Sequence, residues 1–348
     1  MKNKVLTGLL LVLIGGWGSL SAQNVGSNYA RQVNTLIGTK GVGLTSGYLY
    51  PGATYPYGMV QFTPSYFSKR SGFVINQLSG GGCEHMGNFP TFPVKGKLKM
   101  SPDNILNYRI NISEEKGHAG YYEAMVQEDI KAKLTVTERT GMASYEYPAD
   151  QQYGTVIIGG GISATPIEQA AIVITAPNKC EGYAEGGNFC GLRTPYKVYF
   201  VAEFDTDALE SGTWKRDELK PNTTFAEGEY SGVYFTFDVN KKKNIQYKIG
   251  VSYVSVENAR ENLKAENTGW DFLQIQNQAE SKWNHYLGKI EVEGTNPDRT
   301  TQFYTHLYRS FIHPNVCSDV NGEYMGADFK VHKSRSKHYT SFSNWDTY

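Results

Sequence analysis

The sequence predicts a mainly β protein, an antiparallel β-sandwich followed by helical segments, and three observations support this class. Between Lys95 and Val256 strand patterns alternate with turn signals, and no helical pattern of convincing length intervenes. Near Asn267 the apolar period changes to that of amphipathic helices. Aromatic residues make up 13% of the chain, led by 25 tyrosines, which suits a β-rich protein. Many strands without intervening helices indicate antiparallel sheets rather than a βαβ fold.

Two segments show the alternation of a half-buried strand most clearly. Apolar residues from Ile130 to Val136 alternate with lysines and threonines, and the same pattern runs from Ile245 to Tyr253. Shorter strands are predicted at Thr155–Ile158, Ala171–Thr175, Lys197–Phe204 and Val233–Val239.

Two helices are predicted after the strands. The first runs from Thr268 to Leu287, with its N-cap at Asn267 or Thr268 and its apolar positions on one face. The second begins at Asn296-Pro297, with Asn as the cap and Pro in the first turn, and ends before Pro314. This aromatic-rich second helix predicts the start of an α-helical domain, which we expect to be incomplete at Tyr348.

The stretch Val33–Pro64 is the segment around which we expect the chain to be organised. It holds six glycines and three prolines among tyrosines and short apolar runs. Because glycine permits positive φ and proline fixes φ, the stretch is neither a plain helix nor a central strand. Its tyrosines offer flat faces with polar tips, which favours the wall of a binding site. The alternative is an irregular sandwich edge that packs on its own core.

Composition and the N-terminus limit the class of protein. There are 34 basic and 34 acidic residues, so the chain lacks the basic surplus that a nucleic-acid partner requires. Lys2 and Lys4 precede an apolar run and a small-residue site, which predicts a secretory signal peptide over residues 1–22. The apolar run is too short to span a bilayer, and no later stretch is suitable. We therefore expect an exported protein, either periplasmic or extracellular.

Export makes the four cysteines relevant, because disulfides persist outside the cytosol. Cys180 and Cys190 flank a glycine-rich stretch, CEGYAEGGNFC, which is expected to be a loop that a disulfide between them closes. Cys83 and Cys317 are expected to be buried thiols. Spacing alone does not fix the connectivity.

Two glycine-rich motifs need separate interpretation. Gly159–Ala164 formally fits a dinucleotide-binding pattern, but a strand rather than a helix is predicted next, so we interpret it as a turn. Ser79–Asn88 contains Cys83 and His85, whose spacing favours neither a thiol protease nor a zinc site. It is predicted either to present backbone amides and polar tips to a ligand or to be a structural loop.

Several motifs occur in order from about Val33 to the last residue. The first set is Ile37-Gly38-Thr39, Pro51-Gly52-Ala53, Pro56–Gln61 and Pro64, and the later ones are Tyr304–Arg309, Asn321–Gly326 and Trp345–Tyr348. Together they resemble the successive signatures of glycoside hydrolase family 92. Members are calcium-dependent, inverting exo-α-mannosidases. The resemblance implies a sandwich of the galactose-mutarotase-like supersandwich type, a linker helix and an (α/α) barrel.

The resemblance also implies roles for particular residues. Trp345 and Asp346 would contact the terminal mannose, and a sandwich loop with Gly82, Cys83, Glu84 and His85 would contribute outer sugar contacts. The catalytic acid and base and the Ca²⁺ ligands would lie downstream of the Trp-Asp-Thr motif. No residue of this chain is therefore predicted to be catalytic or metal-binding.

The implied organisation divides the chain into four parts. These are a signal peptide (1–22), a β-sandwich domain (23–265), a linker helix (266–290) and an incomplete catalytic domain (291–348). The implied function is the N-terminal part of a secreted α-mannosidase, of α-1,2 type, that removes mannose from glycans. We expect the 348-residue chain alone to be inactive. The alternative is a carbohydrate-binding sandwich without catalysis.

Overall fold

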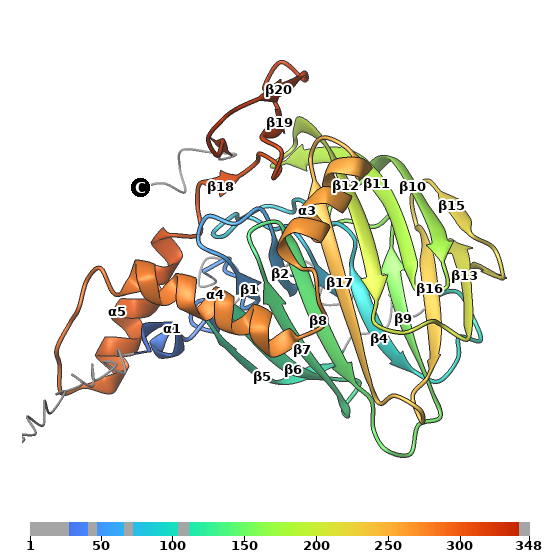
Figure 1. The fold of residues 1–348 in the computed structure, drawn as a ribbon, viewed down its shortest axis with the longest axis horizontal. Coiled ribbons are helices and arrows are strands. Elements are labelled where there is room, and N and C mark those ends of the chain that lie inside the picture. Colours follow the sequence, from blue (N-terminus) through green and yellow to red (C-terminus); the bar gives the residue numbers. More distant parts are fainter. Residues whose placement is uncertain (1–27, 41–46, 66–71, 104–110, 341–348) are drawn as a thin grey trace, which may run out of the picture.

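The computed structural model describes residues 28–40, 47–65, 72–103 and 111–340. Two large antiparallel sheets pack face to face (Figure 1). Helix α3 (Val256–Glu266) lies against the face of one sheet, and the other labelled helices gather at one end of the sandwich. The predicted fold class, an antiparallel sandwich followed by helices, is confirmed. Trp345 and Asp346 lie outside the described residues, as does the predicted signal peptide.

The first sheet has eight strands in the described part of the chain, and the second has nine. In spatial order the first contains β1 (Ala53–Thr54), β2 (Gln61–Pro64), β3 (Phe73–Val74), β4 (Thr91–Lys95), β9 (Tyr153–Gly159), β16 (Ser231–Asp238), β13 (Glu210–Lys215) and β14 (Glu218–Pro221). The second contains β15 (Phe225–Glu227), β10 (Ile167–Ala176), β11 (Lys179–Phe189), β12 (Leu192–Phe204), β17 (Asn244–Ser252), β8 (Thr140–Glu146), β7 (Ile130–Val136), β6 (Tyr121–Val126) and β5 (Ile112–His118). Two small ribbons pair β18 (Asn315–Val316) with β21 (Tyr339–Thr340) and β19 (Glu323–Met325) with β20 (Val331–Lys333).

The main core lies between the two large sheets and is rich in aromatic rings. The Phe204 ring centroid lies 5.0 Å from that of Phe235 and 5.3 Å from that of Tyr247, so the two sheets interlock at this point. All six predicted strands coincide with strands of the structure, and two of them, ending at Tyr253 and Val239, run one residue too far. Gly160 and Gly161 form a turn after β9, and the next element is strand β10, which confirms the predicted turn.

The predicted Cys180–Cys190 disulfide is wrong. The stretch that these cysteines flank is strand β11, in which every second residue from Cys180 faces the core. An extended strand rises about 3.3 Å per residue, which keeps its two ends far apart. Cys190 instead bonds Cys83, with a Cα–Cα distance of 5.3 Å. Cys180 and Cys317 are buried free thiols, so the expectation of a buried thiol holds for Cys317 and not for Cys83.

Helix α3, which follows the last strand of the sandwich, was not predicted from the sequence. Helix α3 (Val256–Glu266), capped by Ser255, packs on β12 and β17. Contact with β17 is direct because Gly250 has no side chain: a Cβ there would lie 2.5 Å from the Ala259 carbonyl oxygen. Helix α4 (Phe272–Leu287) is capped by Asp271, later than predicted. Helix α5 (Pro297–Ser310) has the predicted Asn296 cap.

A second core joins the stretch Val33–Pro64 to α4, α5 and the short helix α1 (Tyr29–Gln32). Tyr50 is fully buried in this core, and the Trp283 indole donates to the Thr54 carbonyl at 2.7 Å. The Arg309 guanidinium donates to the carbonyls of Thr35 (2.7 Å) and Tyr50 (3.1 Å). The stretch therefore does organise the chain, by fastening the sandwich to the helices. Tyr50, expected in a site wall, is a core residue.

Candidate functional site

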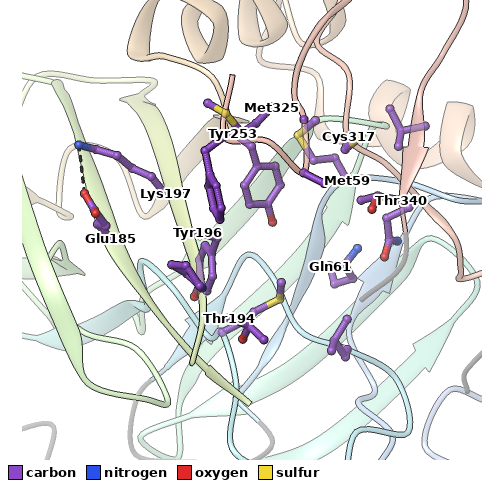
Figure 2. Close-up of a pocket in the computed structure, with 18 residues that line it drawn as sticks. Met59, Gln61, Glu185, Thr194, Tyr196, Lys197, Tyr253, Cys317, Met325 and Thr340 are labelled. Carbon is purple, nitrogen blue, oxygen red and sulfur yellow. Dashed lines mark ion pairs between the residues drawn. The ribbon is translucent and has the colours of Figure 1, made fainter. Parts of the chain in front are cut away.

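A cavity of about 520 Å³ lies where the sandwich meets the C-terminal segment, defined here as Asn315–Thr340. Figure 2 shows Tyr196 and Tyr253 on one side of this cavity, with Met59, Gln61 and Thr340 on the other. The sandwich domain contributes Met59, Gln61, Leu78, Met86, Glu185, Thr194, Pro195, Tyr196, Lys197 and Tyr253 to the lining, and the C-terminal segment contributes Asn315, Val316, Cys317, Met325, Gly326, Ala327, Phe329 and Thr340.

The two tyrosines are oriented by a pair of buried asparagines. The Tyr196 hydroxyl donates to Asn88 Oδ1 at 2.7 Å, and the Tyr253 hydroxyl shares a hydrogen bond with the Asn76 side chain. The two asparagines are joined, with Asn76 Nδ2 donating to Asn88 Oδ1 at 3.0 Å. Because the hydroxyls are fixed, the rings meet edge to face at 6.5 Å and present apolar surface to the cavity.

The glycine loop, Ser79–Asn88, borders the cavity beside these tyrosines. The Cys83–Cys190 disulfide ties it to the turn between β11 and β12, and the His85 ring meets Phe189 edge to face at 5.7 Å. Of the predicted sugar contacts, Gly82 and Glu84 are exposed, the sulfur of Cys83 lies in the disulfide, and His85 is buried.

Both ring nitrogens of His85 are engaged within the protein. Nδ1 lies 2.6 Å from the Cys83 carbonyl oxygen, and Nε2 accepts the Leu78 amide at 2.8 Å. Burial is the main reason that the pKa of His85 is lowered, and nearby His313 lowers it further. His85 thus holds the glycine loop through both of its ring nitrogens.

The opposite wall is held by charged and polar groups. Arg139, which is buried, donates through Nε to the Ser318 carbonyl at 2.7 Å and pairs with Glu138 and Glu266. Asp319 accepts hydrogen bonds from Ser252 (2.7 Å), Asn258 (2.9 Å) and Asn262 (2.6 Å), the last two on α3. Burial raises the pKa of Asp319, although these three donors oppose the change. Helix α3 is therefore the platform for the C-terminal segment.

The described residues do not fit a calcium site. Calcium takes about six to eight oxygen ligands, several of them carboxylates. No group of three or more His, Cys, Asp or Glu side chains in the described ranges is arranged to hold a metal ion. The carboxylates of Glu138 and Glu266 form ion pairs with Arg139. The carboxylate of Asp319 accepts hydrogen bonds from three side chains.

The cavity combines apolar ring surface with a few polar groups, an arrangement typical of small-molecule sites. The side-chain amides of Gln61 and Asn315 both donate to the Gly58 carbonyl, at 3.0 and 2.8 Å. The carboxylate of Glu185 forms an ion pair with Lys197 at 3.4 Å. Such groups suit a pyranose, whose C–H face packs on rings while its hydroxyls form hydrogen bonds. The sequence did not single out Tyr196 and Tyr253, because strand alternation shows which face a residue takes and not which distant residue it meets.

Comparison with family models gives two adjoining matches. Residues 32–252 match the glycosyl hydrolase family 92 N-terminal domain, and residues 258–348 match the family 92 catalytic domain. Within the described residues, no helix has the length and apolar character needed to cross a bilayer.

Three known proteins are similar to most of this chain. An α-mannosidase of family GH92 from Bacteroides thetaiotaomicron, also solved with mannoimidazole, is 25% identical with a TM-score of 0.80, and the match covers 92% of this chain and 46% of that one. An inverting GH92 mannosidase from the same organism is 23% identical with a TM-score of 0.74, covering 92% and 44%. A protein named "Uncharacterized secreted glycosidase" from Arthroderma benhamiae is 26% identical, covering 90% and 45%.

The chain thus spans about half the length of these relatives. Its two family matches together extend from residue 32 to residue 348. The chain belongs to glycosyl hydrolase family 92.

Proposed function

We propose that the chain forms the N-terminal part of an exo-acting α-mannosidase and that its cavity holds part of a mannose-containing glycan. One observation carries this proposal: the cavity is lined from both family matches. Met59, Gln61 and Tyr196 come from the N-terminal match, and Asn315 and Met325 from the catalytic match. A site shared by two domains is a common place for a ligand.

We propose that different parts of the chain have different roles in binding the glycan. The described residues shape the cavity, Trp345 and Asp346 contact the terminal mannose, and exposed Glu84 and Gly82 contact the outer sugar. The domain limits predicted at residues 22, 265 and 290 remain part of this proposal, as does export of the mature protein.

The chemistry proposed for the whole enzyme is inverting hydrolysis, with α-1,2-linked mannose as the substrate. Inversion requires an acid at the leaving oxygen and a base that holds water on the opposite face, the two carboxyl groups being about 6.5–9.5 Å apart. We assign both groups, and the ligands of an assisting Ca²⁺, to residues beyond Tyr348. Glu185, the acidic residue that lines the cavity, is paired with Lys197, and Glu138, Glu266 and Asp319 make the structural contacts given above, which supports this assignment.

The alternative is a sandwich that binds carbohydrate without catalysis. Against it stands the match of residues 258–348 to the catalytic domain of the family. Helix α5 also carries partly buried Phe303, Leu307 and Phe311 along one row, an apolar surface for which a free-standing sandwich has no use.

The test is an activity assay on two proteins. The 348-residue chain should not release mannose from an aryl α-mannoside, whereas a protein extended to the length of the relatives should. A chelator should abolish turnover, α-1,2-mannobiose should be the preferred disaccharide, and the released sugar should be initially β. In the extended protein, Asp346→Ala should cripple hydrolysis. Chelator-sensitive turnover by the 348-residue chain would overturn the assignment of catalytic groups.

A further inference from the structure

We infer that His85 and His313 are positioning residues that must both be neutral for the glycine loop to border the cavity in the form that binds glycan. The part of this inference that concerns glycan binding rests on the proposed function, whereas the histidine contacts come from the structure. Each histidine accepts one of two consecutive backbone amides, those of Leu78 and Ser79, where the loop begins.

The hydrogen bonds fix the tautomer of His85. A carbonyl oxygen only accepts, so Nδ1, which faces the Cys83 carbonyl at 2.6 Å, carries the proton. A backbone amide only donates, so Nε2, which receives the Leu78 amide at 2.8 Å, carries none. His85 is therefore a neutral Nδ1–H imidazole. A second proton on Nε2 would face the amide proton of Leu78 and break this contact.

The same argument fixes His313 from the other side of the cavity. The Asn315 amide nitrogen donates to the carbonyls of Gly58 (2.8 Å) and Ile312 (2.9 Å), so its Oδ1 is the oxygen that faces His313. This oxygen lies 2.9 Å from Nδ1, which therefore carries the proton, and Nε2 accepts the Ser79 amide at 3.2 Å. Because Leu78 and Asn315 both line the cavity, the histidines connect its two walls.

The surroundings favour the neutral form of His85. Burial is the largest cause of the lowered pKa of His85. Among the described residues, His313 is the ionisable side chain whose charge acts on His85, and it lowers this pKa further. Glu84 beside it in the loop is exposed, Glu185 on β11 is paired with Lys197 on β12, and Phe189 offers an uncharged ring.

The direction of the pH effect follows from this lowered pKa. Unfolded His85 titrates near its ordinary value of 6.5, and the folded form binds the proton less readily. The contribution of His85 to loop order is fully present above that pH and is lost as the pH falls through the lowered pKa. An acidic medium should therefore release the loop.

The first experiment needs neither a variant nor a ligand. Histidine ¹⁵N spectra of the 348-residue chain at about pH 7.5 should show an unprotonated Nε2 and a protonated Nδ1 for both residues. Hydrogen exchange, corrected for its intrinsic pH dependence, should show the Leu78 and Ser79 amides protected at about pH 7.5 and exposed at an acidic pH where the same spectra show His85 protonated. The opposite tautomer, or equal protection at both pH values, would overturn the inference.

The second experiment measures binding of α-1,2-mannobiose by NMR titration as a function of pH. Two required neutral histidines give a limiting slope of about two protons in log affinity against pH, and His85→Gln, whose amide keeps one acceptor and one donor, should reduce it to about one. His85→Leu, which removes the acceptor, should weaken binding about tenfold at about pH 7.5, where the wild-type histidine is neutral, equivalent to about 1.4 kcal/mol.

His118→Gln is the matched control. His118 is also a histidine whose pKa is lowered by burial, but it lies beside Glu280 rather than on the glycine loop. Its substitution should leave the slope unchanged. An unaltered slope in His85→Gln would refute the inference even if the sugar binds. Predicted tautomers and exchange without any mannobiose binding would instead refute the proposed function and leave the loop anchors standing.

Discussion

The two walls of the cavity are held by different kinds of interaction. The glycine loop is fastened by a covalent bond, Cys83–Cys190, and by neutral hydrogen bonds to His85 and His313. The C-terminal segment is fastened by the buried charges of Arg139 and Asp319. A disulfide is broken by reduction and a histidine acceptor is lost on protonation, whereas a buried charge is little affected by salt and is lost when its side chain is removed. One wall should therefore respond to reductant and acid, and the other to loss of a single charge.

The largest effect should come from breaking the covalent anchor. The disulfide closes a loop between residues 107 apart, so Cys83→Ser with Cys190→Ser should lower the free energy of unfolding by about 4 kcal/mol. Denaturant titration measures this change. Reductant should bring the wild-type protein to the same value and leave the double variant unchanged. A variant within about 1 kcal/mol of the wild type would show that the loop does not depend on the disulfide.

A smaller loss is expected on the opposite wall. Asp319→Ala leaves three buried donors, on Ser252, Asn258 and Asn262, without this acceptor, and should cost about 3 kcal/mol in the same titration. The control is Asp328→Ala, in the same segment but exposed, which should leave stability near the wild-type value. If both variants unfold alike, Asp319 does not fasten this wall.

The sequence predicts the strands of the sandwich better than it predicts helix α3, which holds the C-terminal segment. Strands such as β7 and β17 were predicted because one face is buried, which imposes a period of two on their side chains. Helix α3 was missed because its buried face includes Asn258 and Asn262, which donate to Asp319, so few apolar residues mark that face in the sequence. Both asparagines can be buried because they donate hydrogen bonds to Asp319. This residue lies later in the chain, so the local sequence of α3 does not reveal the interaction.

The site was predicted less completely than the fold, for similar reasons. Glycine and alanine between Cys180 and Cys190 suggested a loop, yet small residues are what the buried face of β11 accommodates. The glycine loop was identified as a site element, but the sequence cannot show which groups its histidine meets. Trp345 and Asp346 lie outside the described residues, so their predicted contacts with mannose stay predictions.

The smallest effect should come from the exposed end of the charged wall. Lys337 pairs with Glu138, but its side chain is 49% exposed, so Lys337→Met should change stability by less than about 1 kcal/mol. Salt should reduce even this difference. A loss as large as that of Asp319→Ala would mean that the pair with Glu138, rather than the buried acid, holds the segment.

Binding of α-1,2-mannobiose to the 348-residue chain, followed by NMR titration, tests most directly whether the cavity is a glycan site. Tyr196→Ala removes a cavity ring and should weaken binding at least about tenfold, or about 1.4 kcal/mol. Tyr199→Ala is the matched control, because Tyr199 lies on the same strand but does not line the cavity. Loss of affinity in the first variant alone is the predicted result. Equal affinity in both variants and the wild type would contradict the account.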